Sequence, residues 1–105
     1  MRTKPGEIWL ADLGLAAKTR PVLIVSREDA DPPRVLLLYV PLTRQYRGSD
    51  YEVEMKDVRF LNEVSYANVQ GLGSLPAARL ERLLGKISPE LFGKVKTALR
   101  FALDL

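Results

Sequence analysis

Two long apolar runs, separated by a short polar stretch, constrain the fold of this chain most strongly. The runs are residues 22–25 and 35–40, and the stretch between them, residues 28–34, is rich in Asp and Pro. The continuous β-branched run of residues 22–25 is typical of a strand covered on both faces. Residues 35–40 are a second apolar run, and Asp and Pro favour a turn between the two. The pattern therefore predicts an antiparallel hairpin. Pro41 cannot donate a hydrogen bond to a neighbouring strand, so the second strand is expected to lie at an edge or to end there.

Shorter segments on both sides of this hairpin also have strand patterns. Residues 6–13 and 51–55 partly alternate between apolar and polar side chains. Residues 62–75 are expected to hold one or two short strands, broken at Gly71 and Gly73.

The apolar spacing then changes to that of a helix. The residues that recur at this spacing are Leu80, Leu83, Leu84 and Ile87. They predict an amphipathic helix of two to three turns that ends at Gly85. A second helix is expected from Ser88, as N-cap, and Pro89, at the first helical position. Many short strands followed by two helices predict a small, mostly β fold, a coiled antiparallel sheet or barrel with C-terminal helices packed at one end.

The composition is that of an ordinary soluble domain. The chain has 105 residues, 47% of them hydrophobic, which is enough for one core, so we expect a single domain over residues 1–105. The net charge of +3 is only mildly basic and indicates no particular partner. No apolar run approaches the roughly 18 residues of a membrane helix, and the N-terminal segment lacks the apolar region of a secretory signal. We therefore expect a cytoplasmic protein with no membrane partner.

The chain contains neither cysteine nor histidine. Disulfides, thiolate nucleophiles, Ser-His triads and His-ligated metals are therefore excluded. Any catalysis must use carboxylates, hydroxyls, Arg, Lys or backbone amides.

Arg20 lies just before the first apolar run, at the start of a strand that is expected to be buried, where a charged residue is unfavourable. Partners in an antiparallel hairpin have residue numbers with a nearly constant sum. With the turn centred near Asp31, Arg20 falls opposite the segment from Pro41 to Thr43. This register brings a guanidinium and a hydroxyl together at the open end of the hairpin. The alternative is that Arg20 merely ends a strand and that Thr43 is there as a good β-former.

Five segments resemble the MazF/PemK toxins of bacterial toxin–antitoxin pairs. They are GEIWLADL, TRPVLIVS, VPLT, YEVEM and RLERLLGKISPELFGKVKTALRFAL, in the family's order and spacing over nearly the whole chain. The resemblance implies an SH3-like barrel, a homodimer, and a sequence-specific endoribonuclease that cuts single-stranded mRNA without a metal or other cofactor. It also implies inhibition by a segment of a cognate antitoxin, which lies across the RNA groove and whose complex with the toxin binds DNA.

The family's two catalytic residues, the arginine before a proline and the threonine that ends the later strand, match Arg20 and Thr43. The residues expected to bind RNA are Lys18, Thr19, Arg44, Gln45, Arg47 and Gln70, with the Tyr46 ring as a stacking surface. A charged surface loop is the alternative for the loop residues among them. Neither catalytic residue is an obvious base, because a guanidinium stays protonated. Glu52, Glu54 or water are candidates, although solvated strand faces are the simpler explanation for the two carboxylates.

Two segments depart from the family. The loop GLAAK, residues 14–18, is short, whereas many members carry a longer, Gly-rich loop that covers the groove. The family's Gln-Ile-Arg-Thr is replaced by residues 71–74, GLGS, so that Gly73 stands in place of an arginine. The target sequence therefore need not be that of other members. Two functions of other classes stay open: a toxin of the same fold that blocks DNA gyrase without cleaving anything, and an inactive dimer that binds a partner peptide.

Overall fold

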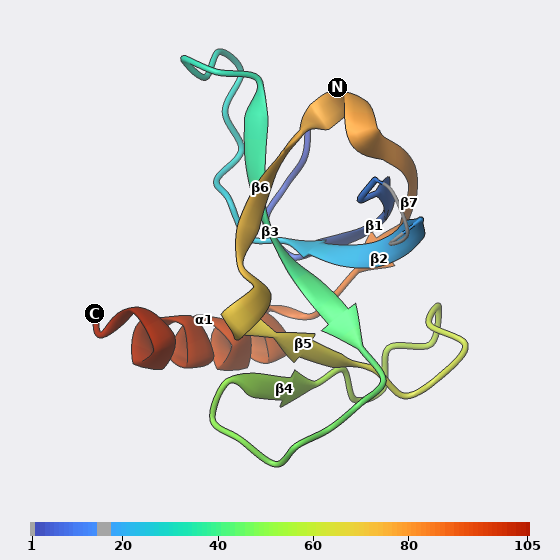
Figure 1. The fold of residues 1–105 in the computed structure, drawn as a ribbon, viewed down its shortest axis with the longest axis vertical. Helices are drawn as coiled ribbons and strands as arrows, with labels where there is room; N and C mark the ends of the chain where they lie inside the picture. Colours follow the sequence, from blue (N-terminus) through green and yellow to red (C-terminus); the bar gives the residue numbers. More distant parts are fainter. Residues whose placement is uncertain (1, 15–17) are drawn as a thin grey trace.

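A computed structural model describes residues 2–14 and 18–105 (Figure 1). Short strands dominate, and one long helix closes the chain. In order, the elements are β1 (Glu7–Asp12), β2 (Thr19–Ile24), β3 (Leu36–Thr43), β4 (Glu52–Glu54), β5 (Tyr66–Asn68), the 3-10 helix η2 (Val69–Gly71), β6 (Gly73–Pro76), the 3-10 helix η3 (Ala77–Arg79), β7 (Leu80–Lys86) and α1 (Pro89–Leu103).

All strand pairs are antiparallel, and their order is β4-β5-β3-β2-β1-β7, with β6 also paired to β3. The long strand β3 connects two parts of the molecule, because residues 36–39 pair with β6, residues 39–41 pair with β2, and residues 42–43 pair with β5. In Figure 1, β1, β2, β6 and β7 curl around one end of β3, whereas β4, β5 and α1 lie at the other. The prediction of a mostly β, antiparallel fold is confirmed.

Strand β2 is buried on both faces, as its continuous apolar run predicts. Val22, Leu23 and Ile24 are all 0% exposed. Leu23 belongs to a core beside α1, the helix core, which contains Ile8, Leu23, Val40, Met55, Ala67, Val69, Ile87, Leu91, Val95 and Ala98. Its two neighbours belong to a second, the barrel core, which contains Trp9, Ala11, Val22, Ile24, Leu37, Leu75 and Leu80. The two cores hold β2 from opposite sides, because alternate side chains of a strand point to opposite faces.

The helix predicted over Leu80 to Ile87 is wrong, since β7 occupies this segment. β7 pairs with β1, and the register shifts at two points along the pair. Each shift leaves one additional residue in β7, as in a β-bulge. The apolar side chains therefore recur every three to four residues instead of every two. Leu80 packs in the barrel core, whereas Leu84 and Ile87 pack with the helix core.

Helix α1 is the second predicted helix, and it begins as expected. The Ser88 hydroxyl accepts a hydrogen bond from Leu91 N at 3.1 Å, and Pro89 is the first helical residue. Its buried side chains include Leu91 and Val95, which lie four residues apart on one face of the helix and pack in the helix core.

Strand β3 lies inside the sheet, so the expected edge position of Pro41 is wrong, although the strand ends two residues later. Pro41 pairs with Val22 on one side. On the other side, η2 passes the strand between β5 and β6. A Cβ atom on Gly71 would lie 2.5 Å from the Pro41 ring, so glycine is required for this approach. The close packing fixes the position of η2 and of Gln70 within it.

Candidate active site

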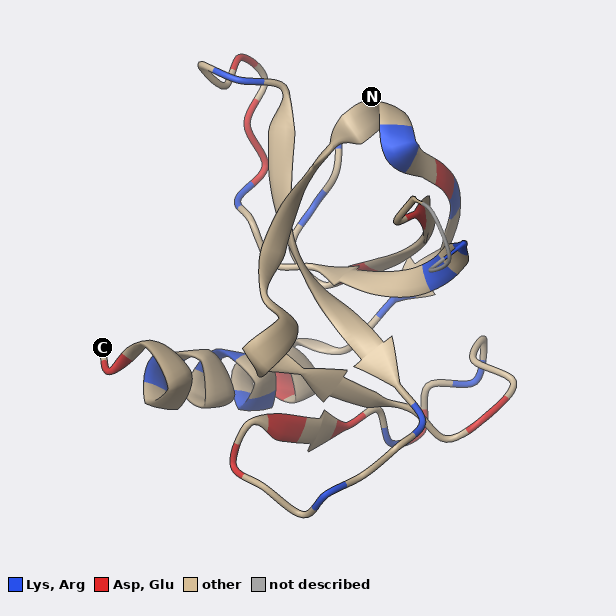
Figure 2. Ribbon diagram, viewed as in Figure 1, with Lys and Arg blue, Asp and Glu red and all other residues tan. Residues whose placement is uncertain are grey.

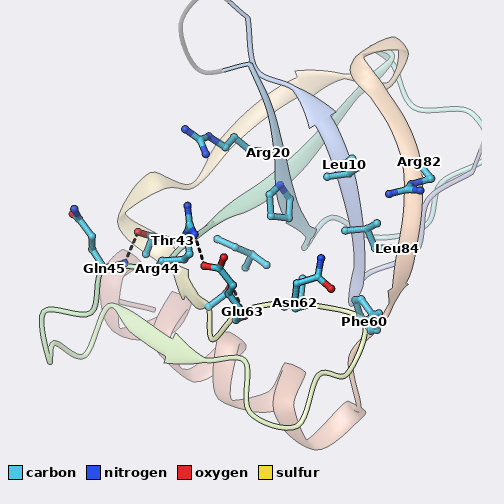
Figure 3. Close-up of a pocket in the computed structure, with 14 residues that line it drawn as sticks. Leu10, Arg20, Thr43, Arg44, Gln45, Phe60, Asn62, Glu63, Arg82 and Leu84 are labelled. Carbon is cyan, nitrogen blue, oxygen red and sulfur yellow. Dashed lines mark hydrogen bonds and ion pairs between the residues drawn. The ribbon is translucent and has the colours of Figure 1, made fainter.

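The observed hairpin register supports the predicted meeting of Arg20 and Thr43. Val22 pairs with Pro41, and Ile24 pairs with Tyr39. Continuing this register by two residues places Arg20 opposite Thr43. Both residues line one cavity of about 770 Å³, which we call the main cavity (Figure 3).

The main cavity lies between the β1–β2–β7 surface and the segment that precedes β5. Pro21 and Leu42 contribute apolar surface from the hairpin, and residues 60–63 form part of the opposite wall. Its position depends on Gly85 in β7, because a Cβ atom there would lie 2.6 Å from the Phe60 ring. Glycine thus lets Phe60 pack directly on β7, and this contact holds the wall beside the hairpin.

The Arg20 side chain is exposed, and its guanidinium forms no hydrogen bond or ion pair with the residues that the structure describes. Figure 3 shows it above the main cavity, on the same side as Thr43, Arg44 and Gln45. A structural arginine at a strand end would be expected to hold a carboxylate or a carbonyl. This geometry favours a guanidinium that is available to an anionic ligand.

Thr43 has a defined hydroxyl orientation. Its Oγ1 accepts a hydrogen bond from Gln45 N at 3.1 Å, so the O–H remains available as a donor to a ligand. Arg44, the residue between them, forms an exposed ion pair with Glu63 across the main cavity (Figure 3). Sequence reasoning did not find Glu63, because it lies in an irregular segment and no periodicity or spacing connects it to the hairpin.

The other expected RNA-binding residues divide into two groups. Gln45, Arg47 and Gln70 line a smaller cavity of about 270 Å³, the side cavity, which shares Thr43 and Gln45 with the main one. Lys18 and Thr19 line neither cavity. Both are exposed beside Arg20, and the Thr19 hydroxyl donates to Glu81 at 3.2 Å.

Glu52 fastens the loop between β3 and β4. Its carboxylate accepts hydrogen bonds from Ser49 Oγ at 2.7 Å, from Ser49 N at 3.0 Å and from Arg47 N at 3.0 Å. The Ser49 hydroxyl contributes most to lowering the pKa of Glu52, followed by the Arg47 amide, since both favour the ionised form. Glu52 lines the side cavity and Glu54 lines neither, so the two carboxylates considered as bases lie away from the Arg20 cavity.

We expect Glu52→Ala to release this loop. The backbone amides of Arg47 and Ser49 would lose their acceptor and exchange faster with solvent, which hydrogen-exchange NMR measures. Because the folded pKa is lowered, the stabilisation is complete above the ordinary carboxyl pKa of 4.5 and is lost as the pH falls through the lower folded value. Glu54→Ala, in the same strand, is the matched control and should leave both amides protected. Equal protection in the two variants would contradict the assignment.

The loop is also held by an aromatic stack. The Tyr46 ring lies 4.5 Å from the Tyr66 ring, centroid to centroid, with 15° between the planes. Tyr46 is nevertheless 56% exposed. The ring expected to stack on a base is therefore already stacked on one face, against β5.

The position that departs from the family, Gly73, faces Tyr39 across the β3–β6 pair. A Cβ atom on Gly73 would lie 3.3 Å from the Tyr39 ring. The tyrosine ring thus occupies the space next to this position, and a larger residue would have to displace it.

Positive charge is dispersed over the chain and does not form one continuous stripe (Figure 2). Arg82, on β7, adds a further cation to the main cavity. Sequence reasoning missed it because the segment was assigned to a helix. It also missed Asn68, at the end of β5, which lines the side cavity.

Comparison with known proteins gives one consistent family. The model of the PemK-like, MazF-like toxins of type II toxin–antitoxin systems matches residues 4–103. Endoribonuclease MazF3 of Mycobacterium tuberculosis is 31% identical over 88 residues, which cover 84% of this chain and 85% of the relative.

No helix among the described residues has the length and apolar character needed to cross a membrane.

Solved structures are also similar to this chain. A mycobacterial endoribonuclease in complex with its cognate antitoxin has a TM-score of 0.85 and 29% identity, covering 98% of this chain and 96% of its own. The Mycobacterium tuberculosis toxin MazF-mt6 has a TM-score of 0.83 and 30% identity, with 94% and 97% covered. A MazE–MazF complex from Deinococcus radiodurans, at 19% identity and a TM-score of 0.81, is similar in fold.

Proposed function

The chain belongs to the PemK-like, MazF-like toxins of type II toxin–antitoxin systems, and from this membership we propose that it is a sequence-specific endoribonuclease that cuts single-stranded mRNA in the cytoplasm. We propose further that residues 1–105 act as one toxin domain and that Arg20 and Thr43 are the catalytic residues. The observation that carries the assignment is their meeting at the open end of the β2–β3 hairpin, on one cavity.

The proposed reaction is transfer of the RNA phosphate from the 5′-oxygen of the next nucleotide to the adjacent 2′-oxygen. The 2′-hydroxyl loses its proton and attacks phosphorus in line, the P–O5′ bond breaks, and the leaving oxygen is protonated. The products are a 2′,3′-cyclic phosphate and a 5′-hydroxyl. Arg20 suits stabilisation of the phosphorane, since its fork carries a permanent charge and can bind two oxygens. The Thr43 O–H donates to a phosphate oxygen.

Proton transfer needs a group other than these two. Glu63 is the carboxylate that lines the main cavity together with Arg20 and Thr43. We therefore add it to Glu52, Glu54 and water as a candidate base, and its position makes it the better placed of the three carboxylates.

The test of this function is incubation of the purified protein with a long single-stranded RNA in the presence of EDTA. We expect cleavage to continue, because the Arg20 guanidinium, and not a metal ion, would neutralise the charge of the phosphorane. Mass spectrometry of the fragments should find cyclic phosphates and 5′-hydroxyls. Cleavage that stops in EDTA and resumes with Mg²⁺ would overturn the mechanism, and no cleavage under either condition would overturn the function.

We propose that the protein binds the C-terminal segment of a cognate antitoxin across the main cavity. The support is the family membership together with the relative solved in complex with its cognate antitoxin. Such a segment would cover Arg20 and Thr43 and thereby exclude RNA.

We also expect a homodimer. The exposed aliphatic side chains Leu36 and Leu38 lie on β3, and Val35 precedes them. Figure 2 shows the ribbons of β3 and β6 free of charged residues over most of their length. Burial of this surface in a second copy would remove it from water. Light scattering at micromolar concentration should give twice the chain mass, and a monomer would contradict the expectation.

A further inference from the structure

The side cavity is a second candidate site that the proposed chemistry does not use. It lies between the outer surface of β5 and the loop of residues 44–51, and it joins the main cavity at Thr43 and Gln45. At about 270 Å³ it is smaller than the roughly 300–1,000 Å³ of sites for drug-sized ligands. It can hold one flat, polar group of a ligand whose remainder occupies the main cavity.

The lining is rich in side-chain amides. Gln45, Asn68 and Gln70 contribute them, and Arg47 adds a guanidinium. Amides and guanidinium groups are the side chains that read base edges by pairs of hydrogen bonds. Specific recognition of RNA uses unstacked bases of single strands, whose edges are open.

One of these amides has a fixed orientation. Asn68 Oδ1 accepts a hydrogen bond from Gln70 N at 3.2 Å, as the cap of η2. The Nδ2 group therefore remains as the donor available to a ligand. The Arg47 guanidinium adds further groups that can only donate. The Glu52 carboxylate is an acceptor in the same lining, but its two oxygens already accept hydrogen bonds from Ser49 and Arg47.

Two interactions hold the loop that forms one wall of the side cavity. The Glu52 carboxylate fixes the loop backbone at Arg47 and Ser49. The Tyr46–Tyr66 stack fixes the same loop against β5. Such preorganisation lowers the entropy cost of binding and sharpens discrimination between ligands.

We propose that the side cavity binds the base of one nucleotide next to the cleaved phosphate. It selects guanine or uracil, which present a carbonyl oxygen (O6 or O4), over adenine or cytosine, which carry an amino group at the corresponding position. The inference rests on the proposed ribonuclease function, because it places this nucleotide beside the phosphate held by Arg20 and Thr43. Asn68 and Gln70 are the specificity-determining residues, and Asn68 Nδ2 donates to the carbonyl oxygen.

The test exchanges a donor for an acceptor without changing shape. Asn68→Asp keeps the oxygen that caps η2 and replaces Nδ2 by a second acceptor, and Gln70→Glu makes the same exchange at an exposed residue. Wild-type protein and both variants cut an RNA of randomised sequence, and sequencing of the fragment ends gives the base preference at each position. Ala78→Asp, exposed in η3, controls for the added negative charge.

We expect the wild type to prefer guanine or uracil at one position adjacent to the cut. Asn68→Asp should lower that preference about tenfold, or reverse it towards adenine and cytosine, while preferences at other positions persist. Ala78→Asp should cut as the wild type does. If Asn68→Asp does not fold, the base preference of Gln70→Glu tests the proposal by itself. Unchanged preferences in a folded, active variant would overturn the base pocket and leave the ribonuclease standing, whereas a wild type that cuts no RNA would overturn both.

Discussion

Replacing Arg20 with alanine is expected to reduce the rate of RNA cleavage about 10²–10³-fold, as for the loss of one group that stabilises an oxyanion in the transition state. The variant should melt near the wild-type temperature, because the exposed guanidinium has no hydrogen-bonding partner among the described residues. Cleavage rate and melting temperature are to be measured on the same sample. Arg20→Lys should remain strongly impaired, since an ammonium keeps the charge but not the two-pronged geometry.

Arg34→Ala is the matched control, because it removes the same charge from an exposed residue at the closed end of the same hairpin. Its cleavage rate should stay close to that of the wild type. If Arg20→Ala loses stability while each folded molecule cuts normally, Arg20 only ends the strand and the catalytic assignment is wrong.

Replacing Leu23 with alanine is expected to lower the free energy of unfolding by about 2–5 kcal/mol, the usual range for a buried leucine. Leu23 is 0% exposed in the helix core, and its neighbours in β2 fill the barrel core, so little room exists for the surroundings to close the cavity. Denaturation in urea measures the loss.

Val64→Ala is the control for Leu23→Ala, since it shortens an aliphatic side chain that is 63% exposed. Its effect should stay within about 0.5 kcal/mol. A loss below about 1 kcal/mol for Leu23→Ala would show that β2 is not the central support of both cores.

The hairpin could be predicted from the sequence because it depends on local rules. Continuous apolar runs and an Asp-Pro turn specify two paired strands and their register, and the register alone brings Arg20 towards Thr43. Only β2 is buried on both faces, because β3 leaves Leu36 and Leu38 exposed. The start of α1 was likewise predictable, since Ser88 and Pro89 act on the adjacent turn only. Such features need no knowledge of distant parts of the chain.

The features that were missed depend on contacts between distant segments. β7 has helical spacing because its pairing with β1 contains two register shifts, which no local pattern reveals. Glu63 and Asn68 reach the two cavities only because the chain between β4 and β6 folds back on the end of β3. From the sequence, Gly85 was expected to end a helix, whereas in the fold its lack of a side chain allows Phe60 to pack against β7.

The burial of β2 between two cores gives the two cavities different freedom to diverge in evolution. Arg20 lies near the start of β2, a strand that can move only if much of the fold opens. Substitutions in the core residues that hold β2 therefore destabilise the whole protein and are selected against. The loop beside the side cavity is attached chiefly through Glu52 and one aromatic stack. Substitutions there have little effect on the stability of the fold. If the proposed sites are correct, duplicated copies of such a toxin can acquire new target sequences while the proposed catalytic pair is retained.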